Sequence, residues 1–379
     1  MHMPERTASI SRMTWGPRTL AAKWTTAVPV LAVVLLIFTW GRSLAPLLVG
    51  LVSVILAVSV LAAVHHAEVV AHRVGEPFGS LVLAVAVTII EVALIVTLMA
   101  DGGAKGATLA RDTVFAAVMI TCNGIVGISL LVASLRHRVA VFNPEGTGAA
   151  LATVATLATL SLVLPKFTTS RSGAEFSTVQ LIFAALASLV LYGLFVATQT
   201  VRHRNYFLPL TRHGEVVDPE EEYAEGPGRR TALLSLALLG LALIGVVGLA
   251  KGVSPTIESG IRAADLPQAV VGVVIALLVL LPETIAAVRA ARRDRVQISL
   301  NLGYGSAMAS IGLTIPAVAV ASFWLSDPLV LGLNSTHMVL LLLTVSVGTL
   351  TVVPGRATPL QGGVHLVILA AYLQFALTP

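Results

Sequence analysis

The chain has 379 residues and a net charge of +5, with 56% hydrophobic and 11% charged residues. Soluble domains carry about 25% charged residues, so the composition excludes an ordinary soluble domain. Apolar stretches such as 79–100 are long enough to cross a hydrocarbon core of about 30 Å. They lack the alternation of β-barrel strands. The sequence therefore predicts an all-α polytopic membrane protein.

The apolar stretches predict eleven membrane-spanning helices and therefore termini on opposite sides. In chain order the predicted spans are 26–41, 44–73, 78–100, 112–135, 147–165, 176–200, 230–251, 264–290, 295–324, 329–352 and 361–377.

The distribution of Lys and Arg supports this layout. With a cytoplasmic N-terminus, 17 of the 24 Lys and Arg residues fall in cytoplasmic segments and the other seven fall outside. The basic charge is thus explained by topology, and a nucleic-acid partner is not expected. The C-terminus is predicted to lie outside.

The chain divides into four parts. A basic N-terminus with the first helix (1–43) precedes a five-helix repeat (44–201), a cytoplasmic acidic loop (202–230) and a second five-helix repeat (231–379). An odd number of helices in each half inverts one half relative to the other, as in many secondary transporters. The acidic run in the loop is interpreted as a solvated linker, with a weak cation-sensing or proton-sensing patch as the alternative.

Each half carries one glutamate deep inside an apolar span. Gly79-Ser-Leu-Val-Leu-Ala-Val-Ala-Val-Thr-Ile-Ile-Glu91 resembles Val271-Gly-Val-Val-Ile-Ala-Leu-Leu-Val-Leu-Leu-Pro-Glu283. A charge inside a span costs at least about 2.5–3.5 kcal/mol and indicates a functional site. Two close carboxylates can hold a divalent cation or, without it, take up protons. We therefore predict that Glu91 and Glu283 bind cation and protons in turn, with Ca²⁺ as the metal.

Further oxygen atoms lie near these glutamates in the sequence. The carbonyl of Leu278 lacks a helical donor because Pro282 has no N–H. Packing and interhelical hydrogen bonding are the alternative roles for the polar side chains. The predicted auxiliary ligands are Thr88, Asn123, Leu278, Asn301 and Ser306.

A polar cluster lies in the second predicted span. His65 and Glu68 share a helix face with His72, and His66 adjoins them. A metal site or pH sensor and a snorkelling cytoplasmic helix end are both open readings for the histidines. Glu258 precedes Glu283 much as Glu68 precedes Glu91. We predict that Glu68, Glu258, His65 and His66 form pathway entrances or a proton relay.

Two motifs resemble the signature repeats of bacterial calcium/proton antiporters, in the calcium/cation antiporter superfamily. They are Gly75-Glu-Pro-Phe-Gly79 leading into Val87-Thr-Ile-Ile-Glu-Val-Ala93, and Leu281-Pro-Glu-Thr-Ile-Ala-Ala-Val-Arg289 leading into Leu300-Asn-Leu-Gly-Tyr-Gly-Ser306. The resemblance implies a multi-pass protein of the bacterial inner membrane that exports Ca²⁺ in exchange for protons, without a cofactor. Some relatives exchange Na⁺ or K⁺. Many exchangers of the wider family have Gly-Asn-Ala before the glutamate, which this chain lacks.

Three other functions each fit part of the sequence. A Na⁺ or K⁺/proton antiporter would use the same carboxylates and is the main alternative. An intramembrane hydrolase would need Ser306 paired with His337 or His365 and would leave both glutamates without a role, so no enzyme is expected. A channel fits less well than alternating access, because the site is proton-titratable and lies between inverted repeats. The sequence predicts no oligomeric state.

Overall fold

The computed structural model describes residues 20–42, 44–74, 78–211, 214–216, 227–265, 267, 269–324 and 328–378. Long apolar runs form helices here because lipid offers no partners for backbone N–H and C=O groups. The elements are α1 (Leu20–Thr39), α2 (Pro46–Val74), α3 (Phe78–Gly102), η1 (Gly103–Thr108), α4 (Leu109–Met119), η2 (Ile120–Ile125), α5 (Val126–His137), β1 (Ala140–Val141), α6 (Pro144–Ala158), η3 (Thr159–Val163), η4 (Leu164–Lys166), α7 (Thr178–Ala197), η5 (Thr198–Arg202), η6 (Arg204–Phe207), α8 (Arg229–Ala263), α9 (Ala269–Arg292), α10 (Val296–Ala321), α11 (Ser335–Val352), β2 (Arg356–Ala357) and α12 (Pro359–Leu377).

The predicted all-α polytopic fold is confirmed. In the described ranges nine helices are long and apolar enough to cross a membrane, and α1 and α3 contain shorter apolar segments. Each of the eleven predicted spans overlaps one of these nine helices or one of the helices α1 and α3. The seventh span is longer than predicted, because α8 continues to Ala263. The charged residues after 250 end the apolar run without ending the helix. Residues 212, 213 and 217–226 of the acidic loop lie outside the described residues.

Contacts between loops agree with the predicted alternation of sides. β1 pairs with β2 in an antiparallel ladder, which joins two loops predicted to be cytoplasmic. Arg136 Nη1 donates to the carbonyl of Arg292 at 3.1 Å, again between two such loops. On the other side, Glu175 forms a bridge with Val330. The first two contacts thus join loops assigned to one side, and Val330 lies at the outer end of the predicted span 329–352, before α11 begins at Ser335.

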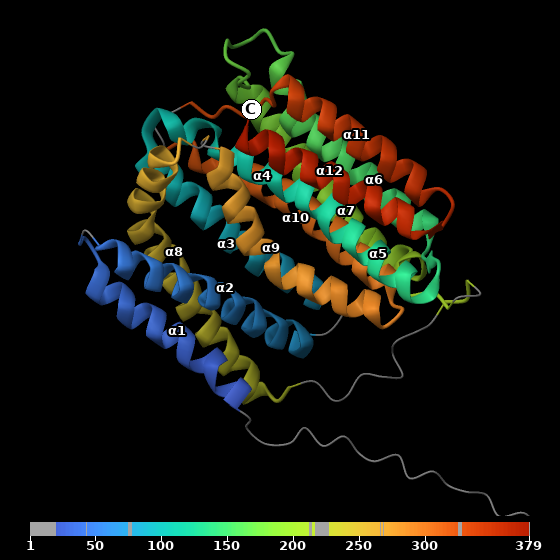
Figure 1. The fold of residues 1–379 in the computed structure, drawn as a ribbon, viewed down its shortest axis with the longest axis horizontal. Helices are drawn as coiled ribbons and strands as arrows, with labels where there is room; N and C mark the ends of the chain where they lie inside the picture. Colours follow the sequence, from blue (N-terminus) through green and yellow to red (C-terminus); the bar gives the residue numbers. More distant parts are fainter. Residues whose placement is uncertain are drawn as a thin grey trace, which may run out of the picture.

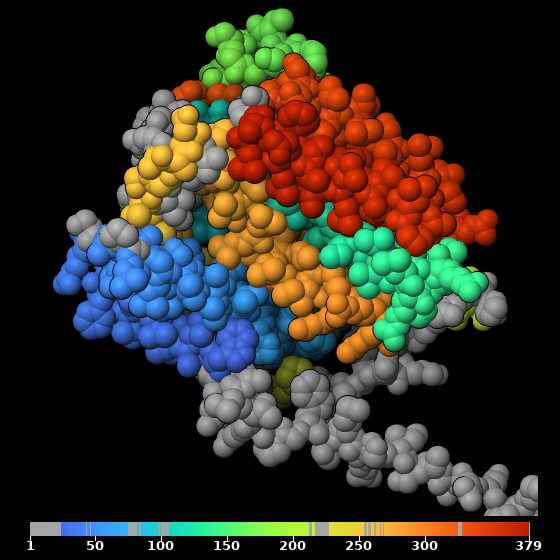
Figure 2. Space-filling model, viewed as in Figure 1, coloured from blue at the N-terminus to red at the C-terminus, as the bar shows by residue number. Residues whose placement is uncertain are grey.

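The helices pack around two hydrophobic clusters. One lies mainly among α4–α7 and α10–α12, and the other lies mainly among α1, α2, α3 and α8. Figure 1 shows α1, α2 and α8 side by side at the lower left, apart from α11 and α12. α9 contributes Ala276 and Leu280 to the first cluster, and Ile275 and Val279 to the second. Figure 2 shows α9, in orange, crossing this face between the two groups. The helix that carries Glu283 therefore lies between the two groups of helices.

The two halves use equivalent pairs of helices for their contacts. α3 packs against α10, and α9 packs against α4. Likewise α7 packs against α10, and α5 packs against α12. Thus α3, which carries Glu91, packs against α10, the helix that follows α9. In the same way α9, which carries Glu283, packs against α4, the helix that follows α3.

Candidate functional site

Glu91 is held on the buried face of α3. Its neighbours Val87, Ile90 and Leu94 belong to the second hydrophobic cluster, and the Glu91 side chain is only 2% exposed. Ser310 on α10 donates its hydroxyl hydrogen to Glu91 Oε2 at 2.8 Å. This hydrogen bond connects the two groups of helices.

The remaining oxygen of Glu91 has no hydrogen-bond partner among the described residues. Thr314 lies one turn beyond Ser310 on α10, is fully buried and lies close to the same carboxylate. Its hydroxyl likewise lacks a partner of its own in the described ranges. Glu91 Oε1 can therefore bind a proton, and together with Thr314 Oγ1 it could coordinate a cation.

Glu283 provides the second buried carboxylate. Its side chain is 8% exposed on α9, directly after Pro282. Glu283 Oε2 has no hydrogen-bond partner in the described part of the chain. The side chain lies within electrostatic range of both Glu91 and Glu68. The structure thus brings the two predicted carboxylates, from opposite halves of the chain, within electrostatic range of each other.

The chemistry of this pair follows from burial. An ionised carboxylate away from water is costly unless a cation or hydrogen bonds compensate its charge. The ion pairs found among the described residues, such as Arg111–Asp112 and Arg171–Glu175, include neither glutamate. The site can reach a neutral state by binding protons or by binding a cation. Two carboxylates and nearby hydroxyls are the hard oxygen ligands that suit Ca²⁺ or an alkali ion.

The predicted auxiliary ligands divide into two groups. Thr88 is buried one turn before Glu91, and Ser306 lies one turn before Ser310. Leu278 lies one turn before Pro282 on α9. These three lie on the site helices, and their ligand roles stay predictions.

Both asparagines are already hydrogen bonded elsewhere. Asn301 donates to the carbonyl of Phe207 at 2.6 Å and accepts from Gln297. Asn123 contacts Thr344 and His365 on α11 and α12. The structure therefore does not bring their amide groups to the Glu91 carboxylate.

The predicted entrance residues also differ in their surroundings. Glu68 on α2 lies within electrostatic range of Glu283, and also of His72 and Arg289. His66 is buried and its Nε2 lies 2.9 Å from the carbonyl of Thr25, so it fastens α2 to α1. His65 is exposed beside it. Glu258 belongs to α8, and its side chain is outside the described residues.

A resident metal site in this histidine cluster gains no support. Within the described ranges there is no group of three or more His, Cys, Asp and Glu side chains that could hold a metal ion.

Ser310 and Thr314 were not among the site residues predicted from the sequence. With Ser306 they recur every four residues, which places them on one face of α10. This spacing is the sequence feature that could have pointed to Ser310 and Thr314. It could not show that the face meets Glu91, because the contact between α3 and α10 joins residues 219 positions apart.

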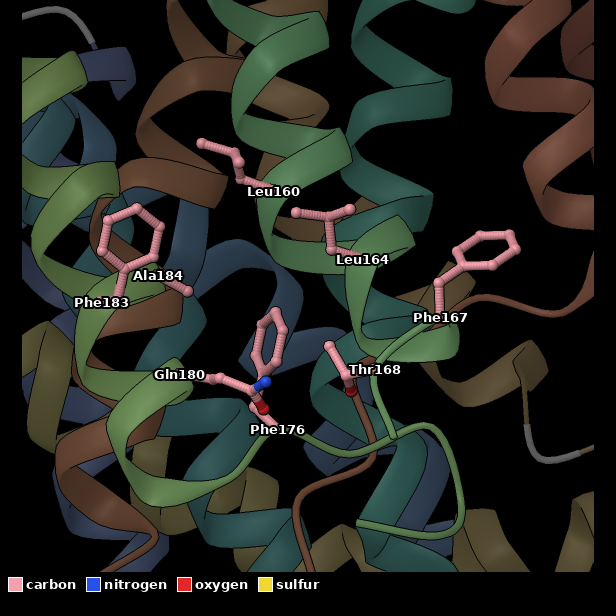
Figure 3. A pocket seen from close by; sticks show the side chains of 8 residues that line it. All are labelled: Leu160, Leu164, Phe167, Thr168, Phe176, Gln180, Phe183 and Ala184. Carbon is pink, nitrogen blue, oxygen red and sulfur yellow. The ribbon is translucent and has the colours of Figure 1, made fainter. Parts of the chain in front are cut away.

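A cavity of about 210 Å³ lies elsewhere. Figure 3 shows its lining side chains, which come from η3, η4, the following loop and the start of α7. Phe167 and Phe183, both strongly exposed, line it. Neither carboxylate contributes to its lining, so this apolar recess is distinct from the ionisable site.

Comparisons with known proteins identify the family of the chain. The family model of the sodium/calcium exchanger protein matches residues 43–201 and 234–378. The chain belongs to the sodium/calcium exchanger protein family. It is 49% identical over 325 residues to the putative ionic transporter y4hA of Sinorhizobium fredii, covering 85% of this chain and 86% of that protein. It is 35% identical over 349 residues to the sodium-potassium/proton antiporter ChaA of Escherichia coli, covering 91% and 93%.

A solved structure has the same fold. The crystal structure of the H⁺/Ca²⁺ exchanger CAX superposes with a TM-score of 0.70 at 14% identity, covering 94% of this chain and 88% of that one. The family consists of membrane transporters that exchange cations. A polytopic cation exchanger is therefore the coarse function of this chain.

Replacing Ser310 by alanine tests the hydrogen bond to Glu91. A hydrogen bond to a charged group contributes about 1.5–3 kcal/mol, so we expect Ser310→Ala to raise the half-saturating cation concentration at least about tenfold. Uptake into reconstituted vesicles measures this. Ser322→Ala is the matched control, because the Ser322 hydroxyl donates only to the nearby carbonyl of Ala319. Equal half-saturation in both variants would show that the Ser310 hydroxyl does not support the site.

Proposed function

We propose that this exchanger exports Ca²⁺ in exchange for protons, with Glu91 and Glu283 binding cation and protons in turn. The observation that carries the proposal is the pair of buried carboxylates. Each retains an oxygen atom with no hydrogen-bond partner among the described residues, and the two side chains interact electrostatically. Charge balance favours a divalent ion, because two carboxylates neutralise one Ca²⁺.

Exchange follows from competition at one site. A bound cation neutralises the carboxylates and displaces their protons, and protons displace the cation in return. The carboxylates lie between helices of two halves that we propose to be inverted repeats, 44–201 and 231–379. That arrangement supports alternating access, in which the site opens to one side of the membrane at a time. Glu68, near both Glu283 and Arg289, would serve as the cytoplasmic relay.

The membrane and orientation follow from charge. The 17 to 7 distribution of Lys and Arg supports a cytoplasmic N-terminus and an external C-terminus in a bacterial inner membrane. In that orientation the β1–β2 ladder is cytoplasmic. Proton entry from outside would then drive cation export.

A monovalent cation is the second candidate substrate. ChaA, the relative that is 35% identical to this chain, is a sodium-potassium/proton antiporter. The hydrogen bonds that the amide oxygens of Asn123 and Asn301 accept, from His365 and Gln297, favour the same candidate, because they leave few amide oxygens for Ca²⁺. One Na⁺ or K⁺ with one retained proton would also neutralise the two carboxylates.

Proton-coupled flux in everted vesicles distinguishes the candidates. Ca²⁺, Na⁺ and K⁺ are each added to acidified vesicles, and the collapse of the proton gradient is recorded. We expect Ca²⁺ to collapse the gradient at the lowest concentration. Collapse by Na⁺ or K⁺ and not by Ca²⁺ would replace the divalent substrate by the monovalent one. No collapse by any of the three would contradict the antiporter proposal.

A further inference from the structure

A second buried polar cluster lies among η2, α11 and α12, and the proposed exchange cycle does not use it. It consists of Asn123 on η2, Thr344 and Thr351 on α11, and His365 on α12. His365 and Asn123 are fully buried, and the two threonines are nearly so. A histidine inside the membrane is costly and indicates a role beyond packing.

The hydrogen-bond donors and acceptors of this cluster can be assigned in turn, starting from Thr344. Thr344 gives its single hydroxyl hydrogen to the carbonyl of Leu340 at 2.8 Å, so its oxygen accepts from Asn123 Nδ2 at 2.9 Å. Asn123 Oδ1 therefore faces His365 Nδ1, 3.1 Å away, which must carry the hydrogen. The neutral imidazole then accepts at Nε2 from the hydroxyl of Thr351 at 3.2 Å. Both ends of the Asn123 amide and both nitrogens of His365 are thus occupied.

The cluster fixes a distorted segment of helix. Asn123 lies in η2, a π-helical stretch between α4 and α5, and such stretches often occur at functional sites. η2 packs against α9, which carries Glu283, and against α10, which carries Ser310. Gly303 on α10 approaches this segment closely, since a Cβ there would lie 3.3 Å from Val126 and 3.4 Å from Ile125. A shift of η2 would therefore move the helices that form the cation site.

We propose that His365 is a positioning residue of the exchanger: through Asn123 it holds η2 in the geometry that spaces α9 and α10 for cation binding. The inference rests on the proposed exchange function and adds to it a residue that touches neither cation nor carboxylate. His365 acts on affinity, because it sets the spacing of ligands in the bound state.

The test compares two substitutions of His365 in reconstituted vesicles, with Ca²⁺ and Na⁺ as the added cations. His365→Leu removes the donor to Asn123, whereas His365→Asn keeps an N–H near the position of Nδ1. We expect His365→Leu to raise the half-saturating cation concentration about tenfold at nearly unchanged maximal rate, as for a buried amide left unpaired. We expect His365→Asn to return it to within about threefold of wild type.

Two further variants make the test decisive. Ser161→Ala breaks another buried interhelical contact, Ser161–Ser188 at 3.3 Å, and should leave half-saturation unchanged. If His365→Leu does not accumulate in membranes, Thr344→Val replaces it, since it removes the acceptor of the Asn123 amide. Wild-type half-saturation in His365→Leu, or equal impairment in His365→Asn, would overturn the inference. Absence of exchange in the wild type would instead overturn the proposed function.

Discussion

Replacing either Glu91 or Glu283 by glutamine is expected to reduce proton-coupled cation exchange at least about a hundredfold. Each substitution removes one buried ligand charge, a loss of about 3 kcal/mol or more. Glutamine has nearly the shape of glutamate but can neither release nor bind the exchanged proton. Both cation binding and proton return should therefore fail, as measured by Ca²⁺-dependent collapse of a proton gradient in everted vesicles.

The same two variants should be at least as stable as the wild type. A buried glutamine avoids the desolvation penalty of a buried carboxylate, so the midpoint of thermal unfolding in detergent should stay equal or rise. Glu175→Gln is the control for exchange, because Glu175 pairs with Arg171 in a loop away from the site. Wild-type exchange in Glu91→Gln or Glu283→Gln would mean that this carboxylate is structural. A large fall in the thermal unfolding midpoint of either variant would likewise indicate that its carboxylate is structural.

The membrane fold was accessible from the sequence because the bilayer imposes it. Length, apolarity and the Lys and Arg distribution predicted eleven spans, and the loops assigned to one side do meet, as Ala140 and Ala357 do across the β1–β2 ladder. The end of α8 was misjudged because charged residues stop a hydropathy run without breaking a helix. Local chemistry therefore predicted which segments cross the membrane better than where each helix ends.

The site was accessible only in part. Glu91 and Glu283 stood out because a lone charge in an apolar span is costly. Asn123 looked like a ligand by residue type, yet its amide bonds to Thr344, 221 positions later, which no local pattern reveals. Ser310 was missed because most of the α10 circumference is buried, so nothing in the sequence marks the face with Ser306, Ser310 and Thr314 as the one that meets Glu91. Ligand choice within a bundle depends on tertiary packing, which a single sequence does not display.

The packing that fixes Glu283 leads to the last prediction, Gly272→Ala. A Cβ at Gly272 would lie 2.8 Å from the backbone of Asp112 and Thr113, so α9 approaches α4 as closely as a glycine allows. Backbone atoms cannot move out of the way as the end of a flexible side chain can. Overpacking of this kind lowers the free energy of unfolding by about 1–3 kcal/mol. We expect a lower thermal unfolding midpoint and at least about tenfold weaker exchange, since Glu283 lies about three turns further along the same helix.

Gly305→Ala on α10 is the matched control for this substitution. A Cβ at Gly305 would meet nothing within 4 Å, although the residue lies on the helix that carries Ser310. Alanine is the better helix former by about 1 kcal/mol, so this variant should exchange normally and unfold at an equal or higher temperature. Equal losses of exchange and of thermal stability in Gly272→Ala and Gly305→Ala would show that exchange depends on the flexibility that glycine gives a helix. Loss in Gly272→Ala alone would show that the close contact of α9 with α4 holds Glu283 in its working position.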